Sequence, residues 1–97
     1  PAKSQPAPEP VSQKEERKLS YAEQREHEKL VRKARKKVEE AEAEIARLEG
    51  EVKAIEEKFA AGETSDALYT AHASATKNLE NAMSVWELAS MELEEIS

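Results

Sequence analysis

The sequence predicts an all-α protein, an antiparallel two-helix coiled-coil hairpin. Apolar residues recur at alternating steps of three and four along two stretches, as they do in coiled-coil helices. Gly62 lies between the stretches, and a short glycine-containing connection favours antiparallel neighbours. The alternative is that each helix pairs with a helix of another molecule. The two apolar rows are Val31, Ala34, Val38, Ala41, Ile45, Leu48, Val52, Ile55 and Phe59, and then Leu68, His72, Ala75, Leu79, Ala82, Trp86, Ala89, Leu93 and Ile96.

The sizes of the apolar side chains favour pairing within one chain. If the chain reverses at Gly62, Trp86 falls opposite Ala41 and Ile45 falls opposite Ala82. Large residues thus meet small ones along the line of contact between the helices, which we call the seam. Complementary volumes of this kind fill a seam at native packing density. The hairpin therefore accounts for the pattern better than two unrelated helices do.

Composition limits the possible classes of protein. The chain has 97 residues, no cysteine, 37% charged residues and 4% aromatic residues, which suits one small helical domain. Without cysteine there is no disulfide framework or thiolate chemistry. The sequence has no long apolar run that predicts a membrane span or a secretory signal. We expect a cytoplasmic protein and a monomer.

The N-terminal stretch differs from the rest of the chain. Residues 1–18 contain all four prolines and little bulky apolar material, so we expect a disordered linker that follows an upstream domain. Ser20 and Glu23 form the S-x-x-E pattern of a capping box, which predicts a helix start at Ser20. The expected elements are a helix over about 20–61 with a possible bend near 30, a turn over 62–64, and a helix over about 65–96.

The predicted register leaves part of the first helix without a partner. Val31 pairs with Ile96, and the chain ends at Ser97, so residues 20–30 extend past the second helix. The second helix carries apolar residues outside its seam. We hypothesise that Ser20 to about Lys29 forms a short N-terminal helix or bent segment that folds back on the hairpin near Trp86 and Leu88.

Charge is concentrated in one segment. Residues 25–37, the basic segment, hold seven cations and two acids, a net charge of 7 − 2 = +5 in a chain of net charge −6. These cations could pair with acids at the end of the second helix, and Lys37 with Glu92 is the natural pair. They could also contact phosphates, because rows of Lys and Arg give sequence-independent affinity for nucleic acid. The seven are Arg25, Lys29, Arg32, Lys33, Arg35, Lys36 and Lys37.

Signals of catalysis or metal binding are weak. His27 lies among charged residues and is expected at the surface. His72 lies in the seam opposite Ile55, where a polar residue usually fixes the register or reaches water. No glycine-rich phosphate loop and no Ser-His-Asp arrangement is evident. We expect no enzyme active site, no metal site and no cofactor in this chain.

Two segments flank the predicted hairpin, Arg17-Lys18-Leu19-Ser20-Tyr21-Ala22-Glu23-Gln24-Arg25-Glu26 and Trp86-Glu87-Leu88-Ala89-Ser90-Met91-Glu92-Leu93-Glu94. With the heptad helix and short turn between them, they resemble the C-terminal domain of ABC-F ATP-binding-cassette proteins, the Uup-like branch in particular. The likeness covers about residues 18–97, although Val31 stands where many members carry proline. It implies a soluble ATPase that acts on the ribosome in translation, with nucleotide-binding domains and their ATP and Mg upstream, and a C-terminal hairpin that binds nucleic acid, including DNA.

Two functions follow as hypotheses. In the first, the seven cations of the basic segment bind DNA or ribosomal RNA. In the second, the hairpin is a structural coiled coil that docks on a protein through apolar residues outside the seam of the second helix. Those residues are Met83, Val85, Leu88 and Met91.

Overall fold

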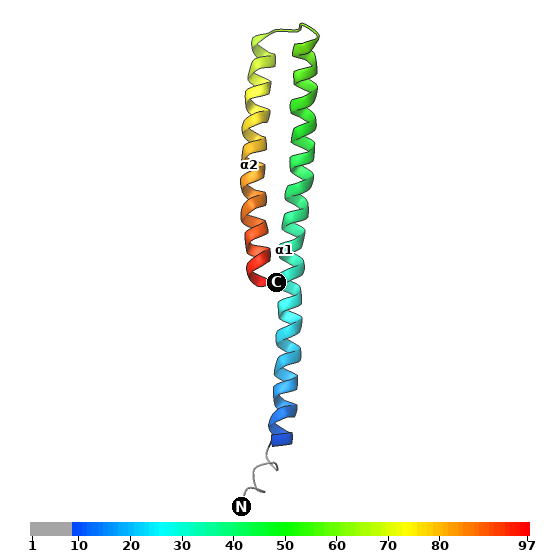
Figure 1. Ribbon diagram of the computed structural model, residues 1–97, viewed down its shortest axis with the longest axis vertical. Coiled ribbons are helices and arrows are strands. Elements are labelled where there is room, and N and C mark those ends of the chain that lie inside the picture. The colour runs from blue at the N-terminus through cyan, green and yellow to red at the C-terminus, as the bar shows by residue number, and fades with distance from the viewer. Residues whose placement is uncertain (1–8) are drawn as a thin grey trace, which may run out of the picture.

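The computed structural model describes the backbone of residues 9–97 and the side chains of residues 20–97. It contains two helices, α1 (Glu9–Ala60) and α2 (Asp66–Ile96). The helices lie side by side and run in opposite directions, and they form a rod 16 × 15 Å in cross-section (Figure 1). The predicted helical hairpin is confirmed.

The seam consists of the residues that the heptad pattern predicts. Between Ser20 and Ala60, the nine residues of the first apolar row are the only ones that are not exposed. In α2 the second row behaves in the same way, with Thr76 and Ser90 added at its edges. The buried positions are mostly alanines, which the larger residues of the other helix cover, and Leu48 is the one large residue among them. The buried residues are Ala34, Ala41, Leu48, Ala75, Ala82 and Ala89.

Contacts between the helices fix their register. The indole Nε1 of Trp86 donates a hydrogen bond to Glu42 Oε2 at 3.2 Å. Near the other end of α2, the rings of Phe59 and Tyr69 stack with their centroids 5.0 Å apart. Both contacts agree with the alignment that places Trp86 beside Ala41. The helices therefore pair within one chain, as the side-chain sizes predict.

The turn ends α1 in a Schellman motif, in which the two residues after a helix bond back to its last carbonyls. The N–H of Gly62 donates to the Phe59 carbonyl at 2.9 Å, and the N–H of Glu63 donates to the Lys58 carbonyl at 3.0 Å. Gly62 has φ of +91°, a conformation that costs residues with a Cβ free energy. Glycine is thus required at this turn.

Ser65 begins α2 as its N-cap. Its backbone is extended, and its hydroxyl oxygen accepts a hydrogen bond from the Leu68 N–H at 3.1 Å. Asp66 lies in the first turn, where a negative charge interacts favourably with the helix dipole. The loop between the helices spans residues 61–65, and the expected turn at 62–64 lies inside it.

The N-terminal part of the hairpin prediction needs two corrections. α1 begins at Glu9 and passes through Ser20 without a break, so the expected start at Ser20 is wrong. Residues 9–18, which we expected to be disordered, are helical, because Pro10 is tolerated in a first helical turn and the following residues are mostly good helix formers. Residues 1–8 of the expected tail lie outside the described residues.

The fold-back of residues 20–29 is also wrong. α1 continues straight past the end of α2 (Figure 1), and every residue from Ser20 to Leu30, the overhang, is exposed. The seam positions continue into the overhang as Ser20, Gln24 and His27, which are polar. The overhang therefore has no apolar face to bury.

Over the residues that the model describes, neither helix contains a stretch long and apolar enough to cross a membrane.

Candidate nucleic-acid interface

The basic segment lies on α1 where the overhang meets the paired rod. Residues 25–30 belong to the overhang, and residues 31–37 run beside the C-terminal end of α2, as the ion pair between Lys37 and Glu92 shows. All seven cations are exposed. The segment therefore extends from a single helix onto a helix pair.

Helical periodicity places four of the seven cations away from α2. An α-helix turns about 100° per residue, and Val31, Ala34 and Val38 define the direction of the seam. The cations at 25, 29, 32 and 36 are spaced by four, three and four, which forms a row on the opposite face. Five of the cations also border one shallow hollow together with Glu39, namely Lys29, Arg32, Lys33, Arg35 and Lys36.

Only two of these cations form ion pairs with residues that the model describes. Lys37 Nζ lies 3.5 Å from Glu92 Oε1, the pair that the sequence predicts. Lys29 Nζ lies 3.9 Å from Glu26 Oε1. More than half of each side chain is exposed in both pairs, and exposed pairs contribute about 0–1 kcal/mol. The expected neutralisation by α2 is thus limited to one weak pair.

Arg25 interacts with an aromatic ring. Its guanidinium lies 5.9 Å from the centroid of the Tyr21 ring and donates a hydrogen bond to the Tyr21 hydroxyl at 3.3 Å. Among residues 20–97, the remaining four cations have no carboxylate within ion-pair distance. These four are Arg32, Lys33, Arg35 and Lys36.

The rest of the hairpin is acidic. Residues 38–97 contain 15 acids and four cations, a net charge of 4 − 15 = −11. The basic segment of +5 therefore borders a rod of opposite sign. This separation directs an anion toward the overhang end and away from the turn.

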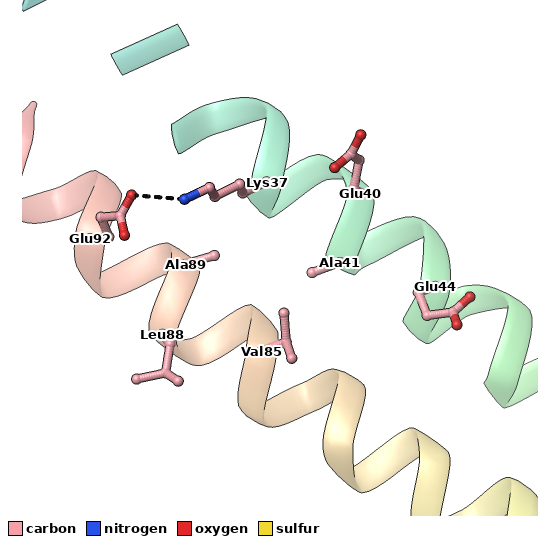
Figure 2. Close-up of a pocket in the computed structure, with 8 residues that line it drawn as sticks. All are labelled: Lys37, Glu40, Ala41, Glu44, Val85, Leu88, Ala89 and Glu92. Atoms are coloured by element: carbon pink, nitrogen blue, oxygen red, sulfur yellow. Dashed lines mark ion pairs between the residues drawn. The ribbon is translucent and has the colours of Figure 1, made fainter. Parts of the chain in front are cut away.

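Two of the four residues proposed for protein docking, Val85 and Leu88, border a groove between the helices (Figure 2). Met83 and Met91 are not among the residues that line this groove. All four are exposed, from 42% for Met83 to 68% for Leu88. The sequence analysis missed the residues of α1 that complete this groove, since only the register shows which of them face Val85.

The histidines occupy the predicted environments. His27 is exposed on the overhang. His72 is half-buried in the seam, and its Nε2 lies 3.2 Å from Glu56 Oε2, while its ring meets Phe59 edge-on with centroids 5.6 Å apart. The seam histidine thus reaches an acid at the edge of the seam. Within the described residues, no three acids, histidines or cysteines converge on a possible metal position.

The fold and the basic segment define a class of protein, a two-helix coiled-coil hairpin with an exposed cationic end. Comparisons with protein-family models, with curated proteins and with solved structures find no match to this chain. The resemblance to ABC-F proteins therefore stays a prediction from the sequence.

Proposed function

We propose that this chain is a non-catalytic nucleic-acid-binding arm whose basic segment contacts the phosphates of DNA or ribosomal RNA. The observation that carries the proposal is the set of exposed cations without a carboxylate partner among residues 20–97, in a chain of net charge −6. Neutralisation within the hairpin would have used the many acids available. The cations instead remain free to exchange solvent counterions for phosphates.

The aromatic residues favour contact with the backbone of the nucleic acid rather than with its bases. Phe59 and Trp86 lie in the seam. Tyr69 stacks on Phe59, and Tyr21 lies beneath Arg25. Among residues 20–97, Arg25 is the one cation of the basic segment with an aromatic ring against it, and binding to single-stranded bases usually uses several such rings. We therefore expect little sequence preference.

The resemblance to ABC-F proteins places this arm at the C-terminal end of a larger ATPase that acts in translation. In that setting the nucleotide-binding domains upstream supply the ATP and Mg sites, and the hairpin contributes affinity for nucleic acid. The seam supports this role because residues 31–60 span about 45 Å of paired helix, which suits a stiff arm.

The test is a salt titration with a matched pair of variants. Fluorescence anisotropy would follow a labelled DNA duplex and a ribosomal RNA hairpin as the protein is added. If about four phosphates are contacted, affinity for duplex DNA should fall about 100-fold between about 50 and about 200 mM salt. Arg32→Glu/Lys33→Glu/Lys36→Glu should weaken binding at least about tenfold at low salt.

The control variant is Lys53→Glu/Lys58→Glu/Lys77→Glu. It changes the net charge by the same 3 × −2 = −6, but its substitutions lie outside the basic segment. We expect only a small loss from long-range repulsion. An equal loss in both variants, or affinity that does not depend on salt, would contradict the proposal. Circular dichroism would establish that both variants remain helical.

A further inference from the structure

A second surface lies between the helices, beside the paired part of the basic segment. It is a groove of about 440 Å³ on one flank of the rod (Figure 2). We call it the acid-rimmed groove. Its lining residues are Lys37, Glu40, Ala41 and Glu44 of α1 and Val85, Leu88, Ala89 and Glu92 of α2.

The floor of the groove is apolar. Ala41 and Ala89 point toward each other across the seam (Figure 2), and both are buried. Val85 points toward α1, while Leu88 projects outward at the edge, and their exposed fractions are 57% and 68%. Positions that flank the seam of a two-stranded coiled coil usually carry charged residues. Two exposed apolar residues beside an alanine floor are instead typical of a surface that packs against another helix.

The apolar floor extends toward the middle of the rod. A neighbouring hollow shares Ala41, Glu44 and Val85 with the acid-rimmed groove and is also lined by Leu48 and Ala82. From Lys37 to Leu48 the two hollows follow about 16 Å of α1, or three helical turns. This length matches a short helix laid along the rod.

The rim selects for positive charge. Three glutamates and one lysine line the groove, a net charge of 1 − 3 = −2. Lys37 is already paired with Glu92, and Glu40 has no cationic partner among residues 20–97. The guanidinium of Arg47 donates a hydrogen bond to Glu44 at 2.8 Å and holds the pKa of that carboxyl below its usual value. Glu44 therefore stays ionised beside Arg47, and Glu40 is the rim carboxylate whose charge is uncompensated among residues 20–97.

We propose that the acid-rimmed groove binds a basic amphipathic helix of a protein partner, whose apolar row packs on Val85 and Leu88 while its Lys or Arg side chains meet Glu40 and Glu44. A second copy of this chain is the competing occupant, because its basic segment is also a helix rich in Lys and Arg. Repulsion between two molecules of net charge −6 disfavours it. The groove proposal does not rest on the nucleic-acid proposal, since Lys37 is the single residue that the two surfaces share.

The experiment uses two synthetic 18-residue helical peptides as probes. Both carry leucine at heptad spacing, and they differ only in having lysine or glutamate beside the leucines. Anisotropy of the labelled peptides would measure binding to the whole chain. The lysine peptide should bind at least tenfold more tightly than the glutamate peptide, and Glu40→Lys/Glu44→Lys should reduce or reverse this preference.

Leu88→Glu separates packing from simple charge attraction. It adds a negative charge, so an interaction driven by charge alone would strengthen, whereas loss of the apolar contact should weaken lysine-peptide binding at least tenfold. Met91→Glu adds the same charge outside the groove and should not weaken binding more than twofold. Both residues are exposed, so the hairpin should stay folded.

The proposal is overturned if the lysine peptide does not bind, if both peptides bind equally, or if Leu88→Glu leaves its affinity unchanged. It is also overturned if sedimentation shows self-association of the chain that Leu88→Glu abolishes. DNA and RNA binding should change less than twofold in Leu88→Glu, so failure of one proposal can be distinguished from failure of the other.

Discussion

The overhang and the paired part of α1 are one continuous helix in two environments. In the paired part, the seam positions are apolar and every third or fourth side chain is covered. In the overhang, the equivalent positions are Ser20, Gln24 and His27, and all side chains are exposed. The comparison teaches that the heptad pattern determines where α2 pairs with α1, while helix propensity alone carries α1 further.

The largest expected effect on stability comes from replacing one leucine in each region by alanine. Leu48 is 2% exposed and Leu30 is 55% exposed. Leu48→Ala should lower the free energy of unfolding by about 2 to 5 kcal/mol, since it deletes buried methyl groups and leaves a cavity. Leu30→Ala should change it by less than about 0.5 kcal/mol. Urea unfolding followed by Trp86 fluorescence would measure both.

A similar loss in the two leucine variants would mean that the overhang packs against something in solution, and the contrast between the regions would disappear. Circular dichroism at the start of each titration would show whether both variants begin from the same helix content.

The two glycines sharpen the comparison at the level of the backbone. Gly62 has a positive φ in the turn, whereas Gly50 lies inside α1, and an added Cβ meets no atom within 4 Å at either residue. Gly62→Ala should destabilise the hairpin by about 1 to 2 kcal/mol because of its left-handed backbone. Gly50→Ala should stabilise it by about 0.5 to 1 kcal/mol, since alanine is the better helix former. Thermal unfolding would show melting temperatures that move in opposite directions.

A stabilising Gly62→Ala would contradict the Schellman turn. A destabilising Gly50→Ala would show instead that the middle of α1 needs glycine for a reason outside the described contacts.

The smallest expected effect on stability comes from two serines, one that begins a helix and one that only matches the sequence pattern of a helix start. Ser65 caps α2, whereas Ser20 lies inside α1. Ser65→Ala should cost about 1 kcal/mol by removing the bond to the Leu68 N–H. Ser20→Ala should be neutral or slightly stabilising. Chemical denaturation of both variants checks this prediction, and a loss of about 1 kcal/mol in Ser20→Ala would restore a helix start at that residue.

Most of the fold could be predicted because the seam is periodic. Each residue of the two apolar rows is buried or half-buried, and the large-to-small pairing fixes the register. The start of α1 could not be predicted from the capping pattern, because Ser and Glu three residues apart also occur inside continuous helices. Proline near residue 10 suggested disorder, yet proline is compatible with a first helical turn.

The candidate site was predictable in part. The cations and the pair between Lys37 and Glu92 follow from spacing and register. The acid-rimmed groove does not, because it depends on which flank of α1 faces Val85. The apolar pattern of the sequence identified Val85 on α2. It could not identify Glu40 and Glu44, the residues of α1 that complete the groove.

The direction of the hairpin has a mechanical consequence. α2 ends at the same end of the paired rod from which the overhang projects, and the turn lies at the opposite end (Figure 1). A force that pulls the overhang away from the C-terminal end of α2 would separate the paired seam residues one pair after another, starting at Ile96 and moving toward Gly62. A compressive force along the rod would act on all the seam pairs at once. The hairpin therefore resists compression better than it resists separation of its two helices.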